Sequence, residues 1–323
     1  MSKIFSGIQP SGELHIGNYL GAVRNWVRLQ HEMESYYCVV DYHAITGDYE
    51  PDDLRRRTRE MAVSLLAAGI DPNVAVVFVQ SKVPEHTELA WAFNAVTPVG
   101  ELERQTQYKE KASRQESVRA GILNYPILQA ADILMYLADT VPVGEDQVQH
   151  LELTREIARR WNARFGEYFP EPAARLTPTR RIMGLDGQAK MSKSLGNTVG
   201  LMDDKETVWA KLRPAVTDPA RVKRSDPGNP DVCNIFQLHR AFSSPETVAQ
   251  VDAQCRSAGW GCIDCKKVLH EAMEVELAPI RAKGAELMAH PEVVEQALGD
   301  GADKARRVAR TTMTEVRQRM GIT

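Results

Sequence analysis

The sequence predicts an α/β fold, a Rossmann-like doubly wound parallel sheet, followed by a C-terminal all-helical part. Three short apolar runs in the first half predict strands, over residues 3–8, 36–40 and 74–79. The third run, VAVVFV, is continuous and rich in β-branched residues, which is typical of strands that are covered on both faces. Strand signals fade after about residue 200. We therefore expect a Rossmann-like domain over residues 1–200 and a helical domain over residues 201–323.

A helix is predicted between the second and third strands, in DDLRRRTREMAVSLLAAGID. Asp52 or Asp53 is expected to cap its start and Gly69 to end it, while Met61 and Leu65 share one apolar face. A strand, a helix and a strand at this spacing predict right-handed crossover connections, and therefore a parallel sheet.

The C-terminal part carries the 3.6-residue periodicity of helices. The segment VKRSDPGNPD is rich in Pro, Gly and Asp and is expected to form a loop. Amphipathic helices are predicted over residues 246–255, 266–288, 291–298 and 302–320.

The composition is ordinary for a soluble globular protein, with 43% hydrophobic and 26% charged residues among 323. The net charge of −3 predicts no general attraction to nucleic acid, so any RNA contact is expected from local basic patches. The opening MSKIFSGIQP lacks the features of a signal peptide, and the longest apolar runs are too short to cross a bilayer. A cytoplasmic protein without membrane contact is expected.

Four of the five cysteines gather in the C-terminal part, with the spacing C-x21-C-x6-C-x2-C. In a cytoplasmic protein such a cluster indicates metal binding or redox chemistry before a disulfide framework. Structural zinc and an iron–sulfur cluster both take four cysteine ligands, and buried thiols without a ligand are the third interpretation. The candidate ligands are Cys233, Cys255, Cys262 and Cys265.

Two short motifs indicate nucleotide chemistry. In GIQPSGELHIGNYLGA a strand ends and HIGN opens a helix, where Gly17 would allow close approach to the backbone and His15 could donate to a phosphate. In RIMGLDGQAKMSKSLGN, Lys190 and Lys193 lie on a loop with three glycines and suit a leaving polyphosphate. Each motif alone also fits a plain helix start or a solvated basic loop.

A third segment, ILNYPILQAADILMYLADTVPVGEDQVQHLELTREIA, places Asp132 inside an apolar helix pattern. A carboxylate there is costly unless it is paired, so Asp132 is either an internal salt-bridge partner or an acceptor waiting for a donor on an apolar ligand. The GEDQ residues follow a predicted strand, at the strand end where open α/β sheets bind ligands. These are Gly144, Glu145, Asp146 and Gln147.

The order and spacing of HIGN, AADILMY, VPVGEDQ and KMSKS resemble the class I aminoacyl-tRNA synthetases, and in particular the bacterial tryptophanyl-tRNA synthetases, over essentially the whole chain. The resemblance implies ATP-dependent formation of tryptophanyl-adenylate and pyrophosphate, with Mg²⁺, and then transfer of tryptophan to tRNA(Trp). It implies His15, Lys111, Lys190 and Lys193 as catalytic residues, with Lys111 preferred over Lys109 in QYKEK. The implied ATP-binding residues are Gln9, Pro10, Ser11, Gly17, Asn18, Gly144, Glu145, Asp146, Ile182, Lys190, Met191, Ser192, Lys193 and Ser194.

For tryptophan, the resemblance implies that Asp132 accepts the indole N–H. An acceptor left without its donor would penalise phenylalanine by about 1–3 kcal/mol or more, whereas tyrosine must be rejected by shape. Gln129 stands where other members often carry methionine. The further implied pocket residues are Phe5, His43, Tyr125, Val141, Val143 and Gln147.

The resemblance also favours a [4Fe–4S] cluster over structural Zn²⁺ at the four cysteines, because a subset of the bacterial enzymes carries one there. It implies a homodimer, with the helical part meeting the tRNA anticodon. Three alternatives stay open: a tyrosyl-tRNA synthetase, a small-molecule nucleotidylyltransferase, and an inactive paralogue that acts as a binding or regulatory protein.

Overall fold

A parallel sheet forms the centre of the N-terminal part of the computed structural model, which describes residues 2–106, 108–109, 117–144, 148–176 and 182–322. The described strands follow the order β3-β2-β1-β4-β5, and all pairs are parallel, as the sequence predicts. The order reverses between β1 and β4, which places a crevice at the carboxyl ends of these two strands. The strands are β1 (Lys3–Ile8), β2 (Glu34–Val39), β3 (Val76–Val79), β4 (Thr140–Val143) and β5 (Ala173–Leu176).

Both faces of the sheet are covered, which explains the continuous apolar runs. Along β2, Tyr37 and Val39 face one hydrophobic core, whereas Tyr36 and Cys38 face a second core on the opposite side. Because successive side chains of a strand point to opposite faces, a strand between two cores is apolar at every position.

The helix α4 (Pro51–Ala67) connects β2 to β3 and corrects the predicted cap. Glu50 is the N-cap and Pro51 occupies the first helical position, so Asp52 and Asp53 lie within the first turn instead. Their carboxylates favour that end of the helix dipole. Gly69 follows the helix with φ of +109°, a conformation that suits glycine, and so ends it as predicted.

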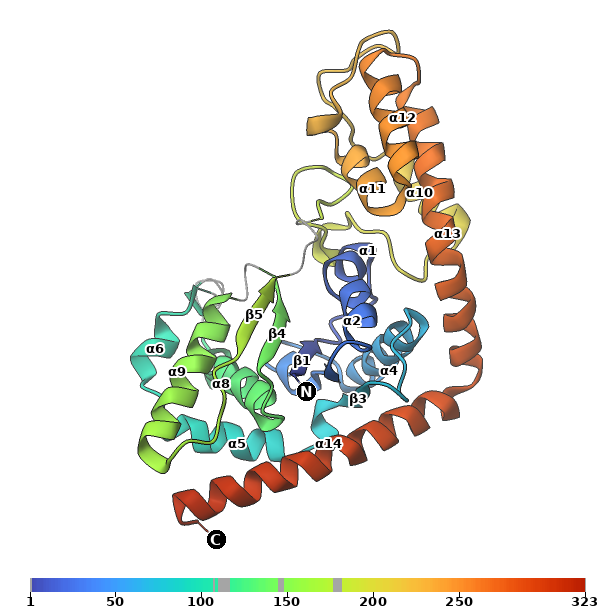
Figure 1. Cartoon of the computed structure of the whole chain (residues 1–323). Coiled ribbons are helices and arrows are strands. Elements are labelled where there is room, and N and C mark those ends of the chain that lie inside the picture. The colour runs from blue at the N-terminus through green and yellow to red at the C-terminus, as the bar shows by residue number, and fades with distance from the viewer. Residues whose placement is uncertain (1, 107, 110–116, 145–147, 177–181, 323) are drawn as a thin grey trace.

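The remaining helices of the N-terminal part surround the sheet (Figure 1). HIGN opens a composite helix, in which a π-helical turn over Tyr19–Val23 joins two α-helical pieces. The α-helices are α1 (Ile16–Asn18), α2 (Arg24–Leu29), α3 (Asp41–Ala44), α5 (Glu85–Asn94), α6 (Val99–Glu103), α8 (Ala120–Met135) and α9 (Val148–Phe165).

After β5 the described chain is helical. Its helices are α10 (Lys205–Leu212), α11 (Asn234–Phe242), α12 (Pro245–Arg256), α13 (Cys262–Ala289) and α14 (Pro291–Met320), and 3₁₀ turns cover Lys193–Leu195 and Pro230–Val232. The helices predicted over residues 246–255 and 266–288 are confirmed within α12 and α13. Among the described helices, none combines the length and apolar character needed to span a membrane.

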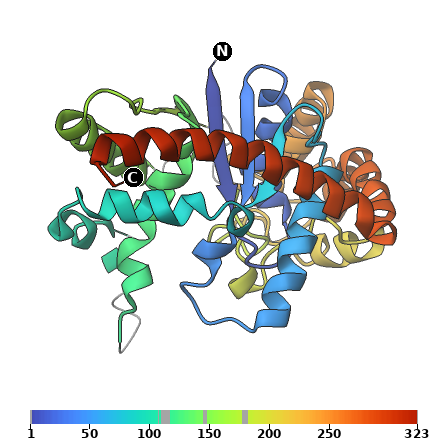
Figure 2. The same cartoon turned by 90° about the horizontal axis from the view of Figure 1, so that it is seen from below.

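The last two helices return the chain to the sheet. The helix α13 runs from the other C-terminal helices toward the sheet, and α14 then crosses the underside of the N-terminal part (Figures 1 and 2). The helix α14 contacts β3 and α5, so the division into domains at residue 200, which stays a prediction, does not separate all C-terminal residues from the sheet.

The predicted break of the last helix at residues 299–301 is wrong, because α14 is continuous through both glycines. A Cβ atom at position 301 would lie 1.8 Å from the carbonyl oxygen of Val77 in β3. Gly301 therefore lets the helix approach the backbone of an edge strand, and the packing outweighs the low helix propensity of glycine.

This contact predicts opposite effects for two glycines of the same helix. Gly301→Ala should lower the free energy of unfolding by about 1–3 kcal/mol, because the helix must move away from β3. Gly299→Ala should raise it by about 0.5–1 kcal/mol, because nothing lies within 4 Å of the added Cβ and alanine favours the helix. Urea denaturation of the two variants checks this, and equal effects would contradict the packing assigned to Gly301.

Candidate active site

A cavity of about 340 Å³ lies where the strand order reverses, at the carboxyl ends of β1 and β4. Nine residues predicted for ATP or tryptophan line it: Phe5, Gln9, His43, Tyr125, Gln129, Asp132, Val141, Val143 and Gly144. The sequence did not point to the other lining residues, which are Ser6, Gly7, Gly21, Ala22, Trp26, Val40, Ile133 and Pro142.

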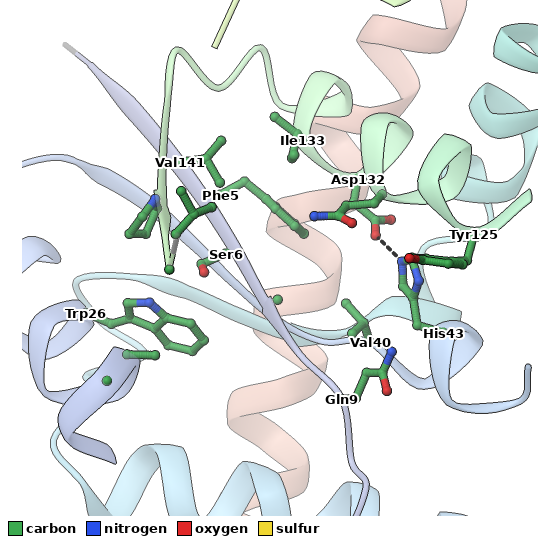
Figure 3. Close-up of a pocket in the computed structure, with 17 residues that line it drawn as sticks. Phe5, Ser6, Gln9, Trp26, Val40, His43, Tyr125, Asp132, Ile133 and Val141 are labelled. Atoms are coloured by element: carbon green, nitrogen blue, oxygen red, sulfur yellow. Dashed lines mark hydrogen bonds and ion pairs between the residues drawn. The ribbon is translucent and has the colours of Figure 1, made fainter. Parts of the chain in front are cut away.

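Asp132 lies on α8 and is only 1% exposed, and its carboxylate accepts hydrogen bonds from three side chains. Gln80 Nε2 and His86 Nδ1 donate to Oδ1 at 2.7 and 2.6 Å. His43 Nε2 donates to Oδ2 at 2.8 Å (Figure 3). These three hydrogen bonds offset the free-energy cost of burying a carboxylate in an apolar helix face.

The same contacts set the charge of Asp132. Burial by itself would raise the pKa of this carboxyl group, but the hydrogen bonds from His43 and His86 outweigh it and hold the pKa below its ordinary value. Asp132 is therefore an ionised acceptor at neutral pH, as the predicted indole contact requires.

Apolar side chains form the walls around this acceptor. Phe5 and Val141 come from the two strands at the switch point, and Trp26 from α2 lies across the cavity (Figure 3). Trp26 is held by stacking on Tyr37, with ring centroids 5.1 Å apart. The Tyr125 hydroxyl lies 2.6 Å from His150 Nε2. The cavity thus combines apolar walls and several polar side chains with one ionised carboxylate.

The HIGN motif lies next to the cavity and begins α1. His15 is its N-cap, and His15 Nδ1 accepts a hydrogen bond from the backbone N–H of Asn18 at 3.2 Å. The neutral imidazole therefore carries its proton on Nε2, which can act as a donor. A Cβ atom on Gly17 would lie 3.2 Å from Cβ of Met191, so Gly17 allows the KMSKS segment to pack closely.

The KMSKS segment is held beside HIGN by backbone hydrogen bonds. The N–H of Ile16 in HIGN donates to the carbonyl of Val199, just after KMSKS, at 2.9 Å, and within the KMSKS loop the N–H of Met191 donates to the carbonyl of Ile182 at 3.1 Å. Lys193 reaches the loop before α1, where its Nζ lies 3.2 Å from the Cβ position of Gly12. Two motifs far apart in sequence thus form one basic site.

The surroundings change the charge states within this basic site. Burial, followed by the charges of Lys193 and Lys190, lowers the pKa of His15 from 6.5 to about 4. Burial also lowers the pKa of Lys193, although the nearby Glu13 carboxylate opposes that shift. His15 is therefore a neutral donor at pH 7, near enough to Lys190 and Lys193 for their charges to lower its pKa.

A depressed pKa makes His15 a source of acid sensitivity. The unfolded chain takes up a proton as the pH falls through 6.5, whereas folded His15 stays neutral to about pH 4, so stability is lost over this window. Between pH 7 and 4.5 the contribution should be about 2–3 kcal/mol. His15→Asn, which keeps an N-cap side chain, should reduce the fall in urea-denaturation stability by that amount. The exposed His31→Asn is the control, and equal falls in both variants would contradict the assignment.

Several predicted residues lie elsewhere. Lys111, Glu145, Asp146 and Gln147 are outside the described residues. Ten others belong to the two adjoining motif segments and not to the cavity lining: Pro10, Ser11, His15, Gly17, Asn18, Ile182, Lys190, Met191, Ser192 and Lys193. The side chain of Ser194 lies outside the described part of the structure. Gln80 and His86 were missed, although Gln80 directly follows a strand and so had the signal that identified Gly144.

The four clustered cysteines meet in the C-terminal part. Cys233, Cys255, Cys262 and Cys265 line one cavity of about 20 Å³, together with Arg221 and other residues. Their thiols form no disulfide, and burial raises the pKa of the Cys265 thiol to about 12. Within the described ranges, no group of three or more His, Cys, Asp or Glu side chains is placed as a metal site.

The surroundings of these thiols suit a thiolate-bound metal in their chemistry. Thr217 Oγ1 and Arg221 Nη1 lie 3.6 and 3.9 Å from Cys262 Sγ as donors, and Arg221 Nε is buried without a partner in the described part of the chain. A Cβ atom on Gly228 would lie 2.6 Å from Cys255 Sγ, so this position keeps the cluster clear of a side chain. A cavity of this volume holds one ion, and a four-iron cluster would require its walls to open.

The parallel sheet, the cavity at its switch point and the adjoining HIGN and KMSKS segments define the class I aminoacyl-tRNA synthetase fold. The sequence profile described as tRNA synthetases class I (W and Y) matches residues 1–278. The chain belongs to this family.

Individual relatives are similar to this chain along nearly their whole length. The chain is 56% identical to a tryptophan–tRNA ligase of Deinococcus radiodurans and 48% identical to one of Thermotoga maritima, with 99% of each chain covered in both cases. Among solved structures, it is similar to the tryptophanyl-tRNA synthetase of Campylobacter jejuni complexed with ADP and tryptophan. That match has a TM-score of 0.90 and 35% identity, and covers 99% of both chains.

Proposed function

We propose that this protein is an ATP-dependent tryptophan–tRNA ligase. A carboxylate oxygen of L-tryptophan attacks the α-phosphorus of ATP, the bond to the bridging oxygen breaks, and pyrophosphate leaves. The terminal ribose hydroxyl of tRNA(Trp) then attacks the activated carbonyl and releases AMP. Two tryptophan–tRNA ligases that match this chain over 99% of their length support this reaction.

The observation that carries the substrate assignment is the buried, ionised Asp132 in a cavity with apolar walls. An indole N–H meets this acceptor, whereas phenylalanine leaves it without a donor. Tyrosine brings a hydroxyl that can also donate, so its rejection depends on the position and shape of the apolar walls. Phe5, Val141 and Val143 are our candidates for those walls.

ATP–pyrophosphate exchange with tryptophan and with tyrosine, followed by aminoacylation of tRNA(Trp), tests the function. We expect exchange with tryptophan to exceed exchange with tyrosine by several orders of magnitude. The reverse preference would support a tyrosyl-tRNA synthetase, and exchange without tRNA charging would favour a nucleotidylyltransferase. Tryptophan binding with neither activity would support a regulatory paralogue.

For the chemistry, we propose that the basic site contacts the phosphates. His15 Nε2–H is a neutral donor beside Lys190 and Lys193, whose charges suit the pyrophosphate as it forms. We also propose Gln9 and Gly144, at the cavity, as contacts to the nucleotide. Mg²⁺ accompanies ATP in this scheme. The predicted roles of Lys111, Glu145, Asp146 and Gln147 stay proposals.

At the four cysteines we propose a resident metal centre, a [4Fe–4S] cluster as the resemblance implies, for which the walls must open, with structural Zn²⁺, which the present cavity accommodates, as the alternative. The donors to Cys262 Sγ and the space left by Gly228 support thiolate ligation. When bound, the centre would supply cross-linking of α12, α13 and the segment before α11, rather than chemistry at the cavity.

The metal is tested by an anaerobic visible spectrum with iron, sulfide and zinc analysis. A broad visible shoulder with stoichiometric iron and sulfide would support the cluster, and colourless protein with one zinc per chain would support the alternative. If the centre serves tRNA contact, its removal should reduce aminoacylation more than pyrophosphate exchange. Equal loss of both activities would contradict that role.

Three further features remain proposals. We propose that the enzyme acts as a homodimer and works in the cytoplasm. We also propose that the residues after about 200 form the domain that meets the tRNA anticodon. Light scattering of the free protein and of its tRNA complex tests the first and gives the stoichiometry of the complex.

A further inference from the structure

The Asp132 carboxylate has a buried side and a side that faces the cavity. Gln80 and His86, which donate to Oδ1, do not line the cavity, whereas His43, which donates to Oδ2, does. Each carboxylate oxygen can accept about two hydrogen bonds. Within the described residues, Oδ1 therefore has its full set of donors, and Oδ2 keeps one acceptor position open.

His86 is itself held in one orientation. Its Nδ1 donates to Asp132, so in the neutral ring Nε2 is the acceptor, and the Tyr136 hydroxyl donates to it at 2.7 Å. Both His86 and Tyr136 are 0% exposed. Phe78 packs beside both rings, with centroids 5.9 Å from His86 and 5.7 Å from Tyr136. The chain Tyr136–His86–Asp132 thus runs from the core to the cavity.

We infer that His86 is a positioning residue for substrate recognition, which holds Oδ1 so that the open position of Oδ2 faces the indole N–H. Gln80 shares this task, and Tyr136 fixes the orientation of the His86 ring. The inference rests on the proposed function, because it concerns how that substrate is recognised. It adds residues that never touch the substrate to those that determine specificity.

A substrate analogue without the N–H separates positioning from general damage. Benzothienylalanine replaces the indole N–H with sulfur, so the ratio of kcat/KM for tryptophan over the analogue measures the value of the N–H contact. His86→Phe should lower this ratio about tenfold, because a charged hydrogen bond is then poorly aimed. The KM for ATP should stay unchanged. Tyr136→Phe should lower the ratio about threefold, because one hydrogen bond further away is lost.

Two variants provide the controls. His86→Asn keeps a donor at the position of Nδ1 and should restore most of the ratio. Phe93→Leu alters an equally buried ring of the same core without a polar contact, and should leave the ratio unchanged. If His86→Phe and Tyr136→Phe reduced activity with both substrates by the same factor, the inference would be overturned. A wild-type chain that does not exchange with tryptophan would instead overturn the proposed function.

Discussion

Asp132→Asn should raise the KM for tryptophan about 100-fold in pyrophosphate exchange while the KM for ATP stays near its wild-type value. The amide keeps one acceptor, and the two donors at Oδ1, Gln80 and His86, will claim it. The NH₂ group then replaces Oδ2, where it faces His43 and the incoming indole N–H. Donor against donor replaces the recognition contact, so ground-state and transition-state binding weaken together.

The control for this variant is Asp71→Asn. Asp71 is also an acceptor, for the backbone N–H of Asn73 at 2.8 Å, but it lies away from the cavity lining. Its exchange kinetics should match the wild type. A small effect of Asp132→Asn on the KM for tryptophan, with the fold retained in urea denaturation, would contradict the assignment of Asp132 as the indole acceptor.

Lys193→Ala should lower kcat for exchange by about 100- to 1000-fold and leave the KM for tryptophan unchanged. The Lys193 ammonium lies against Gly12 in the loop that leads to HIGN, where burial has lowered its pKa and partly removed its hydration. A cation that has already lost water stabilises the charge of departing pyrophosphate without further reorganisation. Its contribution therefore belongs to the transition state.

Lys223→Ala is the matched control, because Lys223 is an exposed lysine in the loop before α11. It should leave kcat unchanged. Single-turnover measurement of adenylate formation separates the chemical step from product release for both variants. If Lys193→Ala raised the KM for ATP without lowering kcat, the lysine would bind ground-state ATP rather than stabilise its cleavage.

Local patterns were sufficient to predict most of the sheet. A short run rich in β-branched residues, such as VVFV, favours a strand covered on both faces, and the parallel order follows from the helices between strands. The helix begins at Pro51, one residue before the predicted aspartates, because the fixed φ of proline suits the first helical position. The continuity of α14 could not be predicted from local sequence. Glycine has a low helix propensity, and the packing of Gly301 against Val77, which favours glycine there, is a contact between distant residues.

The candidate site also contains residues that the sequence predicts and residues that it does not. Asp132 stands out in sequence because a carboxylate interrupts an apolar helix pattern. Its donors Gln80 and His86 lie 52 and 46 residues away, and no local pattern connects them to it. The opposite wall of the cavity, with Trp26, likewise depends on how α2 packs across the sheet. Side chains that touch the ligand were thus easier to predict than those that hold them in place.

The contact between α14 and the edge of β3 also bears on biosynthesis. During translation the strands of the sheet leave the ribosome long before residues 291–320, which form α14. Until those residues emerge, the outer backbone of β3 has no helix to cover it, and an uncovered strand edge is a template for pairing with another chain. A chain without α14 therefore exposes the edge of β3 to pairing with another chain, and docking of this helix removes that exposure.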